Sequence, residues 1–164
     1  MTQDTDKFSK LLLEQVKGAT HVDLLIIKGH ILVEYVMNKF IDTFSKHNQA
    51  AQDIRFTFYQ KIQVCKILGL FYSNESDRLE QQVLILNKLR NEIAHKLSFK
   101  RSLLEDLFRH YPDEENVLER FKPKTRDLKK LRWIIVYICA FLLGRLDGKK
   151  GMQQTLSELE KSKL

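Results

Sequence analysis

The chain has 164 residues, of which 43% are hydrophobic, and it contains only six glycines and two prolines. This length and composition indicate one globular, helix-rich domain that buries about 70% of the surface of its unfolded chain. The two cysteines, Cys65 and Cys139, show no spacing typical of a disulfide framework or a zinc site. We therefore expect a cytoplasmic protein that uses neither a metal nor another cofactor.

The N-terminus and the longest apolar run give no sign of membrane targeting. The first six residues are polar and acidic, whereas a signal peptide begins with a basic and then an apolar stretch. The apolar run over residues 133–143 is shorter than the roughly 20 residues that span a bilayer. We expect neither a signal peptide nor a membrane anchor.

Apolar residues repeat at helical spacing along most of the chain, and no strand-like alternation is present. Glycine and proline mark several expected ends, at Gly18, Pro112, Gly148 and Gly151. We predict an all-α, up-and-down bundle of about five to six helices over residues 1–147, followed by a charged tail over 148–164. The predicted helices cover residues 5–17, 20–46, 54–70, 77–98, from 98 or 102 to 111, and 124–145, with one or two further turns within 113–121.

The predicted helix over 20–46 is the most apolar, which is typical of a central helix. Its polar residues form one narrow strip, spanning about 60° of the helix circumference, that contains Asp23, His30, Glu34 and Asn38. This strip faces water, a partner, or an arginine of a later helix. For His30 we favour a packing or surface role over a catalytic one.

The predicted helix over 77–98 places an arginine on its apolar side. Its apolar stripe runs through Leu79, Val83, Leu86, Ile93 and Leu97, and Arg90 falls in the middle of the stripe. A guanidinium stays charged, so on a buried face it requires a carboxylate, a phosphate or a partner chain. His95 follows five residues later and points about 140° away from Arg90.

The formal net charge of +7 is concentrated in the last quarter of the chain. Residues 1–119 contain 16 Lys and Arg against 17 Asp and Glu, whereas residues 120–164 contain 12 against 4. Positive charge at the start of a helix opposes the macrodipole, so stability gives no reason for this cluster. We interpret it as a surface for nucleic acid, with a solvated end that favours solubility as the alternative; the candidate residues are Lys122, Lys124, Arg126, Lys129 and Lys130.

Arg90, Asn91 and His95 together form an arginine, a polar residue and a histidine five positions after the arginine. In this helical context the pattern resembles the signature of the HEPN superfamily, and Glu34 fits the acidic position that many of its members carry. More faintly, the chain resembles the mannitol operon repressor family. The bare spacing of Arg and His occurs often by chance, so the helical context carries the resemblance.

The HEPN resemblance implies a helical bundle that cleaves RNA without a metal, at a site shared by the two protomers of a homodimer. Arg90 and His95 would be catalytic, and Asn91 and Glu34 would support them. The resemblance to mannitol operon repressors implies the alternative, a non-catalytic regulatory or interaction module. An antitoxin or a regulatory protein would then be its partner. For Arg90 and Glu34, a buried structural ion pair remains open.

Overall fold

The computed structural model describes residues 3–44, 54–71, 76–111 and 126–162. Within these ranges the chain is helical, without strands, which confirms the predicted all-α bundle of about five to six helices. None of the described helices is both long and apolar enough to cross a membrane. The helices are α1 (Gln3–Lys17), α2 (Val22–Phe44), α4 (Phe58–Ile67), α5 (Ser76–Lys96), α6 (Arg101–Arg109) and α7 (Arg126–Ser162).

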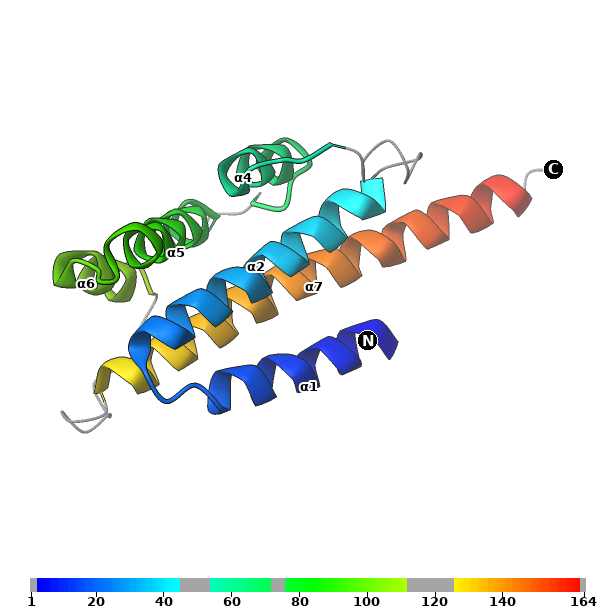
Figure 1. Cartoon of the computed structure of the whole chain (residues 1–164). Coiled ribbons are helices and arrows are strands. Elements are labelled where there is room, and N and C mark those ends of the chain that lie inside the picture. Colours follow the sequence, from blue (N-terminus) through cyan, green and yellow to red (C-terminus); the bar gives the residue numbers. More distant parts are fainter. Residues whose placement is uncertain (1–2, 45–53, 72–75, 112–125, 163–164) are drawn as a thin grey trace.

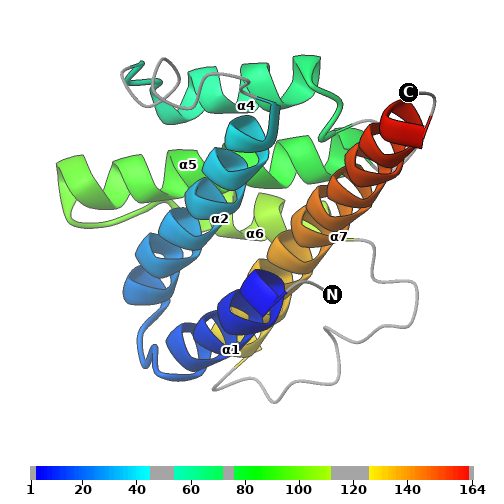
Figure 2. The same ribbon diagram turned by 90° about the vertical axis from the view of Figure 1, so that its right-hand side faces the viewer.

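The helices form two layers (Figure 1). One layer contains α1, α2 and α7 side by side, and the other contains α4, α5 and α6. In Figure 2, α5 crosses α2, and the C-terminal end of α5 extends past it. Since α2 packs against α7, α5, α4 and α1, it is the central helix that its apolar sequence predicted.

The two longest helices approach each other closely at a glycine. Leu25, Ile26 and Val33 of α2 are fully buried, and so is Ile135 of α7. A methyl group built on Gly29 would lie only 2.5 Å from Cδ1 of Ile135. The absence of a side chain at Gly29 therefore allows the backbone of α2 to approach α7.

The boundaries of α4 follow from local signals that the periodic pattern did not reveal. Thr57 caps the helix, because its hydroxyl accepts from Gln60 N while the Gln60 side chain accepts from Thr57 N. Gly69 follows the helix with a φ of 82°, which favours glycine. The helix is thus shorter than the predicted 54–70, and residues 54–57 are not helical.

The prediction that Gly148 and Gly151 interrupt the last helix is wrong, because α7 continues to Ser162. A glycine inside a helix costs only about 1 kcal/mol relative to alanine and does not prevent helix formation. The residues around these glycines are mostly good helix formers. The predicted turns within 113–121 lie outside the described residues.

Candidate functional site

Arg90 lies beside the buried stripe of α5 and not on it, which corrects the sequence prediction. The buried side chains in this half of the helix are Leu86, Leu89 and Ile93, whereas Arg90 is exposed. The helix packs against α2, α6, α4 and α7 through these apolar side chains, and the Arg90 side chain projects outside that contact. Arg90 is thus accessible to a ligand.

The three motif residues lie together on the last two turns of α5. Nη1 of Arg90 donates to Oδ1 of Asn91 at 3.1 Å, and the Asn91 side chain is half-buried. His95 is exposed. Among the described residues, neither Arg90 nor His95 forms an ion pair. Both side chains that carry the predicted chemistry are therefore open to solvent.

Arg90 and His95 do not contact each other in the described structure. The helix remains regular to Lys96, so five residues separate the two side chains by about 140° and about 7.5 Å along the axis. Among the described residues no contact joins them. On a regular helix the two side chains therefore point in different directions.

The turn after His95 is held by Glu92. Its carboxylate accepts from the backbone N of Lys100 at 2.8 Å and from Nζ of Lys96 at 3.0 Å. The hydrogen bond from the Lys100 backbone lowers the pKa of Glu92 most, and the hydrogen bond from Lys96 lowers it further. Leu97, between the two helices, has a φ of 57°, in the left-handed region that favours glycine. The end of α5 that carries His95 is thus anchored to the start of α6.

Glu34 pairs with Lys61 and not with Arg90. Nζ of Lys61 lies 2.6 Å from Oε1 of Glu34, and the lysine side chain is only 14% exposed. This ion pair connects α2 to α4. The buried Arg90–Glu34 pair that the sequence left open is therefore wrong.

His30 is a buried packing residue between the two layers, as the sequence favoured. Its Nε2 donates to Oδ1 of Asn87 at 3.1 Å, and its ring stacks on Phe58 with 4.0 Å between centroids. Burial is the main cause that lowers the pKa of His30, and the charges of Arg90 and Lys61 lower it further. The hydrogen bond with Asn87 and the charge of Glu34 raise it, but by less. His30 is therefore neutral near pH 7 and connects the layers beneath Arg90.

Sequence reasoning missed Lys61, Asn87 and Phe58. Asn87 could have been found, because it lies one turn before Arg90 and directly follows the apolar run 83–86. Lys61 and Phe58 gave no such signal, since their role depends on where α4 packs. Lys61 reaches Glu34, and Phe58 reaches His30, only because α4 packs on α2.

The basic cluster separates into different roles. Lys122 and Lys124 lie outside the described residues. Lys130 is half-buried, with Nζ 5.7 Å from the centre of the Phe108 ring, whereas Arg126 and Lys129 are exposed. Arg132 Nη2 donates to the backbone oxygens of Ala19 and Lys17, at 2.6 and 3.2 Å, and so completes the end of α1. Of the described candidates, Arg126 and Lys129 are the most available to a polyanion.

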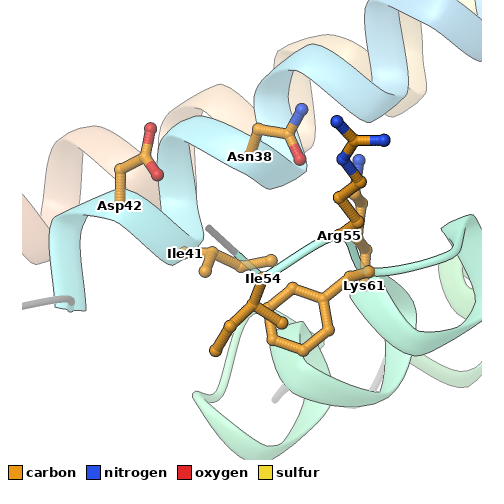
Figure 3. Close-up of a pocket in the computed structure, with 7 residues that line it drawn as sticks. Asn38, Ile41, Asp42, Ile54, Arg55 and Lys61 are labelled. Carbon is orange, nitrogen blue, oxygen red and sulfur yellow. The ribbon is translucent and has the colours of Figure 1, made fainter. Parts of the chain in front are cut away.

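A cavity of about 410 Å³, with Lys61 in its lining, lies beside α4 (Figure 3). It is bounded by the last turns of α2, the segment that precedes α4, and α4 itself. Among the described residues, no group of three or more His, Cys, Asp or Glu could hold a metal ion. The cavity is lined by Asn38, Ile41, Asp42, Ile54, Arg55, Phe56 and Lys61.

Comparison of the chain with protein-family models, with curated proteins and with solved structures gives no match. The site therefore has to be interpreted from its own geometry and chemistry.

Proposed function

We propose that this chain is a metal-independent endoribonuclease of the HEPN type that acts as a homodimer with a shared Arg90 and His95 site. The observation that supports it most is the exposure of both side chains without an ion pair among the described residues. A purely structural pair would be buried and satisfied. An exposed arginine and histidine near the end of an anchored helix can instead bind and act on a phosphodiester.

The chemistry of the two groups suits RNA cleavage. The guanidinium of Arg90 stabilises charge that develops on the phosphate, and Asn91 restricts its position. Neutral His95 takes the proton of the 2′-hydroxyl, whose oxygen attacks the phosphorus. The bond from phosphorus to the 5′-oxygen breaks, and this oxygen takes a proton from protonated His95 of the partner subunit. Two histidines thus supply the base and the acid.

An exposed apolar stripe on α2 supports the dimer. It lies at helical spacing, and two of its members flank His30, which contacts α5, in the sequence. Monomeric proteins rarely expose contiguous apolar patches of this kind unless they are interaction surfaces. We place the contact between protomers on this stripe, whose members are Leu24 at 39%, Ile27 at 36%, Ile31 at 58% and Tyr35 at 45% exposure. Arg126 and Lys129 would guide the RNA.

The test is cleavage of single-stranded RNA by the purified protein in EDTA. We expect His95→Ala to slow cleavage by about 10²- to 10⁴-fold and Arg90→Ala by about 10²- to 10³-fold. His21→Ala and Arg78→Ala are matched controls, because both residues are exposed and lie outside the motif. Equal cleavage by wild type and His95→Ala, or no cleavage by the wild type, would refute the proposal.

Mixing subunits tests whether the site is shared. If one site needs the histidine of both protomers, heterodimers of wild type and His95→Ala are inactive. After subunit exchange, activity then falls with the square of the wild-type fraction. A linear decrease would show that each protomer acts alone.

The second candidate is a non-catalytic regulatory or interaction module, which the same apolar stripe of α2 also supports. The stripe would then bind an antitoxin or a regulatory protein, and Arg90 would hold the assembly together. Under this alternative, Arg90→Ala lowers the melting temperature or dissociates the complex and no RNA is cleaved. Under the nuclease proposal the fold survives Arg90→Ala, because its guanidinium is exposed.

A further inference from the structure

The cavity beside α4 has one apolar wall and one polar wall. Its apolar wall consists of Ile41, Ile54 and Phe56, and its polar wall contains Asn38 and Arg55. In Figure 3 the Arg55 guanidinium extends toward Asn38, and Ile41 and Ile54 lie at the other end. A volume of about 410 Å³ is within the range of small-molecule sites, roughly 300–1,000 Å³. Such walls fit a ligand with a flat apolar part and a charged part.

Arg55 is the cation of the cavity that is available to a ligand. Lys61 is already paired with Glu34 at 2.6 Å, so its charge is balanced. Arg55 is exposed and forms no ion pair among the described residues, although Asp42 lines the same cavity. A guanidinium binds phosphate through two parallel hydrogen bonds. We therefore expect Arg55 to contact the phosphate of a ligand.

The remaining polar groups require a ligand that also donates hydrogen bonds. Asp42 and Asn38 lie four residues apart on the same side of α2. The carboxylate of Asp42 only accepts hydrogen bonds, and it repels a small inorganic anion. A nucleotide satisfies all of these groups, because its sugar hydroxyls and base amines donate, its base covers Phe56, and its phosphate meets Arg55.

The cavity lies on the same part of the molecule as Arg90. Asn38 is eight residues after His30, about 12 Å along α2, and the Glu34–Lys61 pair lies between them. His30 in turn donates a hydrogen bond to Asn87, which lies one helical turn before Arg90 on α5. An RNA strand whose phosphate binds Arg90 would reach the cavity if it follows α2 toward its C-terminal end.

We infer that the cavity formed by Asn38, Asp42, Arg55 and Phe56 binds one nucleotide of the RNA strand near the cleaved phosphate. This inference rests on the proposed ribonuclease function. It assigns substrate positioning to a set of residues outside the Arg90 and His95 motif. The groups that select the nucleotide belong to α2 and to the segment before α4.

Binding of the four nucleoside monophosphates, measured by calorimetry and by amide NMR, tests the inference. At least one of them should bind and shift the amide signals of residues 38–42 and 54–61. Arg55→Gln should weaken its affinity by about tenfold or more, since a charge-assisted hydrogen bond is lost. Arg78→Gln, which changes an exposed arginine of α5, should leave the affinity unchanged. The matching nucleoside and inorganic phosphate should each bind at least about tenfold more weakly than the nucleotide.

Cleavage kinetics separate this inference from the proposed function. We expect Arg55→Gln to raise KM for RNA with little change in kcat, and His95→Ala to abolish cleavage while nucleotide binding persists. If the wild type binds a nucleotide but does not cleave RNA, the proposed ribonuclease function is refuted, whereas the nucleotide site in the cavity is supported. Absence of nucleotide binding, phosphate binding as strong as that of the nucleotide, or an unchanged KM in Arg55→Gln would overturn the inference alone.

Discussion

Leu97 holds a backbone conformation that suits glycine better than leucine. Its φ is 57°, and its N donates to the backbone oxygen of Ile93 at 3.0 Å, which closes the last turn of α5. The left-handed region costs a residue with a side chain roughly 1–2 kcal/mol. The Leu97 side chain is 87% exposed, so its removal loses little buried apolar surface.

We expect Leu97→Gly to raise the free energy of unfolding by about 0.5–1 kcal/mol. Relief of the strained φ stabilises the native state, and the greater freedom of glycine in the unfolded chain offsets part of the gain. Urea denaturation measures the difference. Leu97→Ala is the control, because it removes the side chain and keeps the strain. A glycine variant that is less stable than the alanine variant would contradict this account.

His30 makes stability depend on pH in a predictable direction. Burial lowers its pKa in the native state, whereas in the unfolded chain the pKa is about 6.5. As the pH falls below about 6.5, the unfolded chain therefore binds a proton before the native protein does. The stability that neutral His30 supports is fully present above this pH and is lost as the pH falls toward the native pKa.

We expect His30→Gln to flatten the stability profile below about pH 6.5, because glutamine does not titrate and its amide can still donate to Asn87. Thermal melts across this range provide the measurement. His21→Gln changes an exposed histidine and should leave the slope as in the wild type. An equal slope in the wild type and in His30→Gln would show that other groups control the acid sensitivity.

At the scale of elements, the α2–α7 contact depends on the absence of a side chain at Gly29. An added Cβ would lie 2.5 and 2.8 Å from Cδ1 and Cγ1 of Ile135, which is fully buried. We expect Gly29→Ala to destabilise the protein by about 1–3 kcal/mol, the usual cost of overpacking a core, despite the better helix propensity of alanine.

Ile135→Val removes the Cδ1 atom that clashes, so it should recover part of the loss in the double variant. A double-mutant cycle by urea denaturation measures this coupling. Gly144→Ala is a control in α7, because a Cβ there meets no atom within 4 Å. Additive effects of Gly29→Ala and Ile135→Val would argue against close contact of the two helices at this point.

The existence of the helices could be predicted from the sequence, but several of their ends and contacts could not. The predicted helices overlap α1, α2, α4, α5, α6 and the first part of α7. The start of α4 at Thr57 depends on one side-chain cap, and the continuation of α7 through Gly148 depends on its neighbours. The exposure of Arg90 depends on how α5 packs against the other helices, which no local pattern encodes. The pairing of Glu34 with Lys61 depends on the docking of α4 for the same reason.

At the scale of the whole molecule, the two layers differ in how firmly they are held. The long helices α2 and α7 pack along each other, whereas α4 has only 10 residues and packs on α2 and α5. A helix of this length is not stable alone in water and depends on its tertiary contacts. We infer that α4 opens before the α2–α7 pair does. Opening of α4 would remove Lys61 from the lining of the cavity.

The two buried cysteines lie in different layers, so their labelling measures the opening of each layer separately. Cys65 lies in α4 and Cys139 lies in α7, and burial raises the pKa of both thiols to about 12. At pH 8 neither thiol reacts in the native state, because the thiolate is the nucleophile. Labelling therefore requires that the helix carrying the cysteine first opens.

Under native conditions we expect Cys65 to react with iodoacetamide faster than Cys139, since opening of α4 alone exposes it. In denaturant above the unfolding transition the two rates should become equal. Peptide mass spectrometry follows each site, and the single variants Cys65→Ala and Cys139→Ala confirm the assignment. Equal native labelling rates would mean that the two layers open as one unit. The cavity beside α4 would then be as rigid as the α2–α7 core.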